Sequence, residues 1–260
     1  MPRVLCYHRI GGQLELGVTR VGQGVFARQM TALARAGWRT LTLSEFTTVL
    51  AHRDSAFRIP HSAFLLTFDD GYTELAEHAY PVLADLGFTA VTFLITDFVG
   101  RENTWDVRYT WERLRHLDWP AIEHWLARGF EFGSHGAAHR RLTWLDAAAV
   151  TEDLSGARAE LVRRLGPAAG RAVAYPFGAT DARIARLAAA AGYELGFSGV
   201  RGDASNLLDQ PRVPVYVWDA FSVPLGLRAG MLGDAGRFVA HAANRCAVGT
   251  SWMLRLSGRR

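Results

Sequence analysis

Residues 64–71 read F-L-L-T-F-D-D-G, an apolar run that ends on two aspartates and a glycine. A run of this length bounded by a turn signal is typical of a strand buried on both faces of a sheet. Asp-Gly is also a common turn dipeptide, so the aspartates alone are compatible with an ordinary end of a strand. Comparable apolar runs recur at residues 4–8, 90–96, 130–135, 172–177 and 193–198. We therefore expect a series of buried strands.

Segments with helical patterning lie between these runs. Residues 26–37 carry apolar side chains at helical spacing and end on a glycine. Residues 143–146, T-W-L-D, have the form of a capping box with Asp in place of Glu, and they open a segment that extends to about residue 166. Residues 181–191 form a further helix candidate. From about residue 225 we expect a helical C-terminal extension.

Strand and helix alternate along the chain without a linker rich in Pro, Gly or Ser. This order predicts one parallel β/α domain over residues 1–260, built as an incomplete or distorted barrel. The alternative is an open, doubly wound sheet that binds a nucleotide. The sequence does not support this nucleotide-binding alternative. No G-x-G-x-x-G motif follows the first predicted strand, and the P-loop motif needs a lysine, which the chain does not contain.

The composition suits a globular protein and excludes several classes. The 260 residues are 49% hydrophobic, enough to bury a sizeable core. The net charge of +4 comes from arginines scattered among acidic residues, so we expect no nucleic-acid partner. We find no apolar window of membrane-spanning length and no signal-like segment after Met1, which predicts no membrane span and a cytoplasmic location. Cys6 and Cys246 favour buried thiols over a disulfide.

Polar residues follow the predicted strands where each one ends. If the strands are parallel, their carboxyl ends meet at one mouth, which brings together Asp69, Asp70, His135 and the P-F-G at residues 176–178. His135 and His139 enclose three residues, a spacing at which two imidazoles can meet, although the pattern alone is weak. Two imidazoles and one carboxylate form the ligand set of an open catalytic zinc site. A second carboxylate beside them could accept a proton from water.

The motifs T-F-D-D-G (67–71), H-G-A-A-H (135–139) and Y-P-F-G (175–178), in this order, resemble the NodB-type polysaccharide deacetylases, carbohydrate esterase family 4. The similarity extends from about residue 4 to about residue 217. It implies a deformed (β/α)7 barrel. It also implies an enzyme that removes N-acetyl groups from amino sugars with the help of a metal ion.

The resemblance also assigns roles to individual residues. It implies that Asp69 is the general base, that Asp70, His135 and His139 bind the metal, and that the backbone N–H of Phe177 binds the oxyanion. A divalent cation is therefore the expected cofactor. Zinc is the first choice, and two imidazoles with one carboxylate also suit Co²⁺, Ni²⁺ or Mn²⁺.

The first predicted strand, V4-L-C-Y-H8, ends on a histidine. Alone, such a histidine is more often structural than functional. The family also needs a histidine acid on a late strand, and that motif is missing here, because His241 falls in a segment that reads as a terminal helix. Members that resemble the circularly permuted poly-N-acetylglucosamine deacetylases begin with a strand ending in Y-H. The resemblance therefore implies that His8, in its protonated form, is the general acid.

The chain departs from the family pattern at three points. Gly136 follows His135 where the family usually has Ser or Thr, which removes a hydroxyl that could brace the loop. Ala174 stands where an arginine usually orients the base, so the partner of Asp69 is unassigned. The family's tryptophan-bearing fourth motif is not clearly matched, and Asp219, after Trp218, is a candidate to orient His8.

The predicted substrate is an N-acetylated amino-sugar glycan or glycoside, and the sequence does not fix which one or the oligomeric state. Trp105 could stack on a sugar ring, with further contacts from Asp106, Tyr175 and Pro176. Two alternatives remain at this stage. One is an O-acetyl esterase or non-sugar amidase on the same scaffold, and the other is a non-catalytic carbohydrate-binding relative. Binding alone would not require a base, three metal ligands and an acid.

Overall fold

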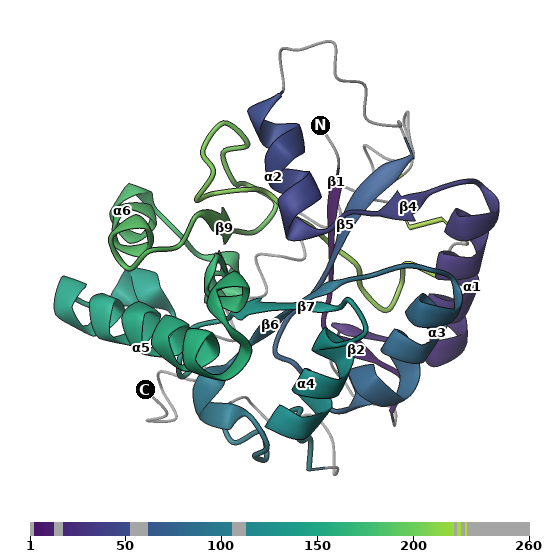
Figure 1. Cartoon of the computed structure of the whole chain (residues 1–260), viewed down its shortest axis with the longest axis horizontal. Coiled ribbons are helices and arrows are strands. Elements are labelled where there is room, and N and C mark those ends of the chain that lie inside the picture. Colours follow the sequence, from purple (N-terminus) through teal and green to yellow (C-terminus); the bar gives the residue numbers. More distant parts are fainter. Residues whose placement is uncertain are drawn as a thin grey trace.

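The computed structural model describes residues 3–12, 18–52, 62–105, 113–220, 223–224 and 227 (Figure 1). Its central sheet follows the order β10-β1-β5-β6-β7-β8-β9, and β4 pairs with β5 outside this path. The strands are β1 (Arg3–Tyr7), β4 (Arg39–Thr40), β5 (Ala63–Phe68), β6 (Val91–Leu94), β7 (Glu131–Ser134), β8 (Ala172–Ala174), β9 (Leu195–Phe197) and β10 (Val213–Pro214). A separate pair joins β2 (Arg9–Ile10) to β3 (Arg20–Val21).

All neighbouring strands of the central sheet run parallel, so their carboxyl ends lie at one end of the sheet. Each of the six apolar runs overlaps one of these strands. The segment after β9 bends the sheet towards closure. Gln210 forms a parallel bridge with Phe197 at one edge, and Val213 pairs with Leu5 of β1 at the other. The predicted distorted barrel is confirmed.

The strands of the six apolar runs are almost entirely buried, as predicted. Phe64, Leu66 and Phe68 of β5 pack in one hydrophobic cluster with side chains of α1 and α3. Leu65 packs on the opposite face with Phe93 of β6. This alternation gives the sheet a core on each side, and it leaves the carboxyl ends of the strands for polar residues.

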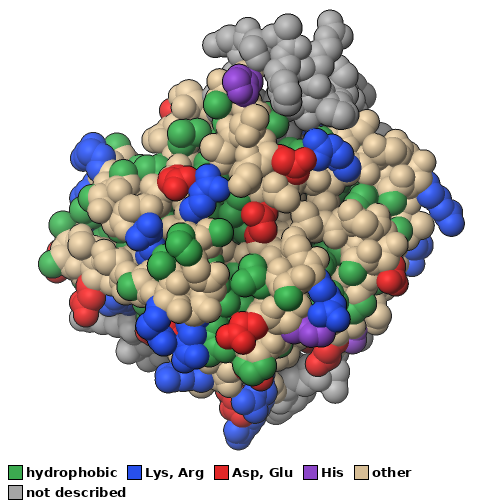
Figure 2. All heavy atoms as spheres, viewed as in Figure 1, with side chains coloured by type: hydrophobic (Ala, Val, Ile, Leu, Met, Phe, Trp, Pro, Cys, Tyr) green, Lys and Arg blue, Asp and Glu red, His purple; other side chains and the backbone are tan. Residues whose placement is uncertain are grey.

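Six helices surround the sheet in the described part of the chain (Figure 1). They are α1 (Gln23–Arg35), α2 (Leu43–Ala51), α3 (Tyr80–Asp85, after a π-helical turn at Leu75–Ala79), α4 (Trp119–Leu126), α5 (Ala147–Leu165) and α6 (Ala182–Ala190). None of them combines the length and apolarity needed to cross a bilayer. On the face that Figure 2 shows, basic and acidic side chains are interspersed.

The predicted start of α5 was wrong. Thr143 lies in a separate 3-10 turn, and the helix begins after Asp146, whose carboxylate accepts a hydrogen bond from the Ala149 N–H at 2.8 Å. A carboxylate at this position satisfies an N–H that has no partner within the helix, so Asp146 displaces Thr143 as the cap. Asp181 caps α6 in the same way. The predicted C-terminal extension, apart from Leu227, lies outside the described residues.

Candidate active site

Asp69 and Asp70 follow β5 directly, and the backbone between them turns sharply. The Asp69 N–H still donates to the Tyr7 carbonyl at 3.0 Å, which continues the pairing with β1. Asp70 and Gly71 then adopt left-handed φ values of 68° and 70°. A Cβ atom on Gly71 would lie 2.6 Å from a methyl group of Leu94, so glycine is favoured there by both the left-handed φ and the close packing. This turn lets the two adjacent carboxylates reach different partners.

Asp70, His135 and His139 meet beyond the ends of β5 and β7. The Asp70 Oδ1 atom lies 3.5 Å from the Nε2 atom of each histidine. The His135 Nδ1 donates to the Ala174 carbonyl at 2.7 Å, which fixes the ring and turns Nε2 towards Asp70. One ligand atom of each residue lies within 4.8 Å of the others. The predicted metal ligands are therefore brought together.

The protonation of these ligands also suits a metal. Burial lowers the pKa of both His135 and His139, so the imidazoles are neutral at neutral pH and carry a free lone pair. Neutral nitrogen donors with one carboxylate oxygen are a donor set that zinc and related divalent cations accept. The residues present thus fit the cation that the sequence predicted.

The loop between the two histidines is braced by Asp153 of α5. Its carboxylate accepts hydrogen bonds from the Ala137 N–H at 2.9 Å and from Arg140 at 3.2 Å. Gly136 has a φ of 76°, and a Cβ atom there would lie 2.7 Å from the Asp153 carboxylate. The loop is therefore supported without the Ser or Thr hydroxyl that the family usually has, because the buried Asp153 carboxylate occupies that position.

Arg212 is the partner of Asp69 that the sequence did not reveal. Its guanidinium donates to both carboxylate oxygens, at 2.6 and 2.7 Å, and both side chains are buried. Burial alone would raise the pKa of Asp69, but the charges of Arg212 and then His135 outweigh it, and the pKa lies below its usual range. Asp69 is therefore held as a carboxylate in one orientation.

We predict that Arg212→Met destabilises the fold strongly. Removing one partner of a buried ion pair leaves an uncompensated charge, which costs about 3–5 kcal/mol. Because the pKa of Asp69 is depressed in the folded state, the ionised carboxylate stabilises the folded protein. This contribution to the free energy of unfolding is complete above about pH 4 and is lost as the pH falls further. Urea unfolding between pH 3 and 7 measures both the loss of stability and its pH dependence. In Arg212→Met, the decrease in the free energy of unfolding that comes from protonation of the paired Asp69 should disappear.

Arg163→Met is the matched control. Arg163 pairs with Glu160 but its side chain is 60% exposed, so the loss should be about 0–1 kcal/mol. Equal losses of stability in the two variants would show that the Arg212 pair is no more important than a surface ion pair.

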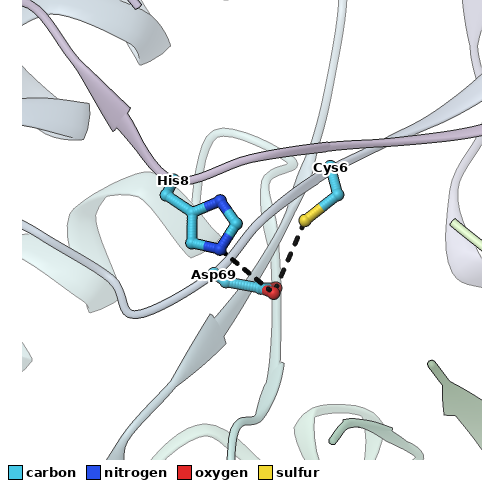
Figure 3. Close-up of side chains that lie close together, drawn as sticks. All are labelled: Cys6, His8 and Asp69. Atoms are coloured by element: carbon cyan, nitrogen blue, oxygen red, sulfur yellow. Dashed lines mark hydrogen bonds and ion pairs between the residues drawn. The ribbon is translucent and has the colours of Figure 1, made fainter. Parts of the chain in front are cut away.

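His8 lies beside Asp69, with its Nε2 atom 4.0 Å from Asp69 Oδ2 (Figure 3). Burial lowers the pKa of His8, and the attraction of Asp69 opposes this only in part. The imidazole is therefore neutral at neutral pH in the free protein, and its role as a protonated general acid stays a prediction. Its Nδ1 atom is buried without a hydrogen-bond partner in the described part of the chain. The support of His8 by Asp219 stays a prediction.

Trp105 lies against His139, one of the predicted metal ligands, and against His116. Its indole lies against His139, with ring centroids 3.7 Å apart, and its Nε1 donates to His116 Nε2 at 3.4 Å. The buried His116 donates in turn from Nδ1 to the Asp70 carbonyl at 2.8 Å. His116 was not among the predicted site residues, because no motif surrounds it in the sequence. Asp106 lies outside the described residues.

The Y-P-F-G motif contributes in a different way than predicted. Tyr175 is fully buried and its hydroxyl donates to the Leu208 carbonyl at 2.9 Å, and Pro176 is buried as well. Direct sugar contacts from these two side chains are therefore corrected to a supporting role. Phe177 has a left-handed φ of 62°, and its ring centroid lies 4.7 Å from that of His139. This contact places Phe177 beside one of the three predicted metal ligands.

Comparisons with known proteins agree with this geometry. The family model described as polysaccharide deacetylase matches residues 58–196. The protein YxkH of Bacillus subtilis (strain 168) is 26% identical over 202 residues, which make up 78% of this chain and 66% of YxkH. IcaB from Ammonifex degensii has a TM-score of 0.67 at 26% identity, covering 93% of this chain and 96% of IcaB. The Streptococcus pyogenes deacetylase PplD in complex with acetate has a TM-score of 0.72 at 21% identity, covering 84% and 93%.

Proposed function

The chain belongs to the polysaccharide deacetylase family, and from this premise we propose that it is a metal-dependent hydrolase of N-acetyl groups on an amino-sugar glycan or glycoside. The products are acetate and a free amine. The observation that carries the proposal is the meeting of two sets of groups at the carboxyl ends of the strands. Asp70, His135 and His139 offer three ligand atoms, and Asp69 and His8 lie beside them.

Each residue at this site has a distinct task. A divalent cation held by Asp70, His135 and His139 would lower the pKa of water and polarise the acetamide carbonyl. Asp69, fixed by Arg212, accepts the proton of the attacking water. The N–H of Phe177 donates a hydrogen bond to the negative oxygen of the tetrahedral intermediate.

His8 completes the reaction by protonating the departing amine. Its imidazole is neutral in the free protein, so it must gain the proton during turnover. Asp69 Oδ2 lies 4.0 Å from His8 Nε2, so the two side chains must approach to hydrogen-bond distance for Asp69 to pass on the proton taken from water. In this sequence the proton moves from water to Asp69, then to His8 Nε2, and finally to the amine nitrogen as the C–N bond breaks.

Trp105 supports a sugar as the substrate. The indole is partly exposed and lies directly on His139, so an aromatic face stands beside the metal ligands. Aromatic rings at binding sites supply apolar area with little conformational cost. A sugar ring stacked there would place its acetamido group near the ligand atoms.

A pair of substrates tests the proposal. We predict acetate release from N-acetylglucosamine oligomers, because the site combines a base for the attacking water with an acid for the amine leaving group, and O-acetylated xylan is the comparison substrate. Acetate is measured by an enzyme-coupled assay on the zinc-loaded protein. Release from the ester alone would assign the site to an esterase, and binding of the oligomers without any acetate would indicate a non-catalytic relative.

A further inference from the structure

A second group of metal-ligating side chains adjoins the one already described. Cys6 and His8 are two residues apart at the end of β1, while Tyr7 between them packs into the core against Phe26. Asp69 follows the neighbouring strand β5. Figure 3 shows the three side chains of Cys6, His8 and Asp69 pointing towards one another. Cys6 and His8 thus form a Cys-x-His pair at the end of one strand. They face the carboxylate that follows the neighbouring strand.

The three ligand atoms lie close together. The Cys6 Sγ atom is 3.5 Å from Asp69 Oδ2, and the His8 Nε2 atom is 4.0 Å from the same oxygen. All three lie within 4.8 Å of one another. Donor atoms around a tetrahedral zinc ion are separated by about 3–4 Å, as bond lengths of about 2.0–2.3 Å require. Small side-chain shifts would therefore bring all three onto one ion.

We propose that Cys6, His8 and Asp69 form a second cation site for a thiophilic divalent metal, such as Cd²⁺ or excess Zn²⁺. A thiolate with one imidazole and one carboxylate favours these ions over Mg²⁺ or Ca²⁺, which prefer oxygen ligands. This site is separate from Asp70, His135 and His139, which contain no sulfur ligand.

Binding at this site exchanges one proton for the metal. Cys6 is a buried thiol that donates to Asp69, and burial raises its pKa, so its proton must leave to solvent as the sulfur–metal bond forms. Arg212 donates to the same Asp69 carboxylate, and its positive charge repels a cation bound there. The second site should therefore bind more weakly and fill after the first.

Occupation of the second site would block the proposed deacetylase. The ion would take the lone pair of His8 Nε2 and an oxygen of Asp69, the groups assigned to proton transfer. This consequence rests on the proposed function, whereas the binding of the ion does not. Excess zinc should inhibit the enzyme, and Mg²⁺ at the same concentration should not.

The test is a Cd²⁺ titration of the full chain preloaded with one equivalent of Zn²⁺. Native mass spectrometry counts the bound ions, and the ultraviolet thiolate-to-cadmium charge-transfer band reports a sulfur ligand. We expect the wild type to bind one Cd²⁺ with appearance of the band. Cys6→Ser should bind no additional Cd²⁺ and should show no charge-transfer band. Its activity should also not be inhibited by excess zinc.

Cys246→Ser is the matched control, since Cys246 is the other cysteine of the chain. It should retain the bound Cd²⁺ and the band. Wild-type protein that binds no Cd²⁺ beyond the preloaded ion, or binds it without the band, overturns the proposal even if Cys6→Ser does not fold. Loss of the band in Cys246→Ser overturns it as well. Because these readouts do not need turnover, they remain informative if the protein proves not to be a deacetylase.

Discussion

Asp69→Asn is expected to abolish acetate release while leaving the metal bound. An amide cannot accept the proton of the attacking water, and the loss of a general base costs on the order of 10²- to 10⁴-fold in rate. The metal should stay, because the ligand atoms belong to Asp70, His135 and His139. Inductively coupled plasma mass spectrometry of the purified variant, with acetate measured in parallel, separates the two effects.

Variants of the metal ligands are the controls for this experiment. His135→Ala and Asp70→Ala remove ligand atoms and should lose the metal together with activity. An Asp69→Asn protein that still releases acetate at the wild-type rate would exclude Asp69 as the base. A fully metallated His135→Ala protein would show that the cation is held elsewhere.

His8→Ala is expected to bind metal normally and to lose activity by about 10²- to 10⁴-fold, because the amine then departs without its proton. An ester substrate should suffer less, since an alkoxide leaves with less help from an acid. Acetate release from both substrates, with metal content as the check on the site, measures the difference.

His241→Ala is the control for His8, since it lies in the C-terminal segment where a late histidine would be expected. It should retain wild-type activity. If His241→Ala is inactive while His8→Ala is fully active, the acid belongs to the C-terminal part of the chain, and the role given to the first strand is wrong.

The sequence predicted those parts of the fold and site that depend on local patterns. Short apolar runs identified the strands of the sheet, and the polar residues that follow them, Asp70, His135 and His139, meet as expected. These predictions succeed because parallel strands place their carboxyl ends together whatever the details of the loops.

Long-range pairing could not be predicted in the same way. Arg212 reaches Asp69, 143 positions away, because the segment after β9 closes the sheet against β1. Nothing in the residues around Arg212 indicates this contact. Tyr175 illustrates the opposite error, since it belongs to a recognisable motif but its side chain fills the core.

The most direct test of metal-dependent deacetylation is acetate release from N-acetylglucosamine oligomers by the wild-type protein before and after removal of metal by a chelator. We predict that release stops when mass spectrometry shows no bound metal, and that one equivalent of Zn²⁺ per chain restores it. Full activity in protein shown to be free of metal would contradict the account.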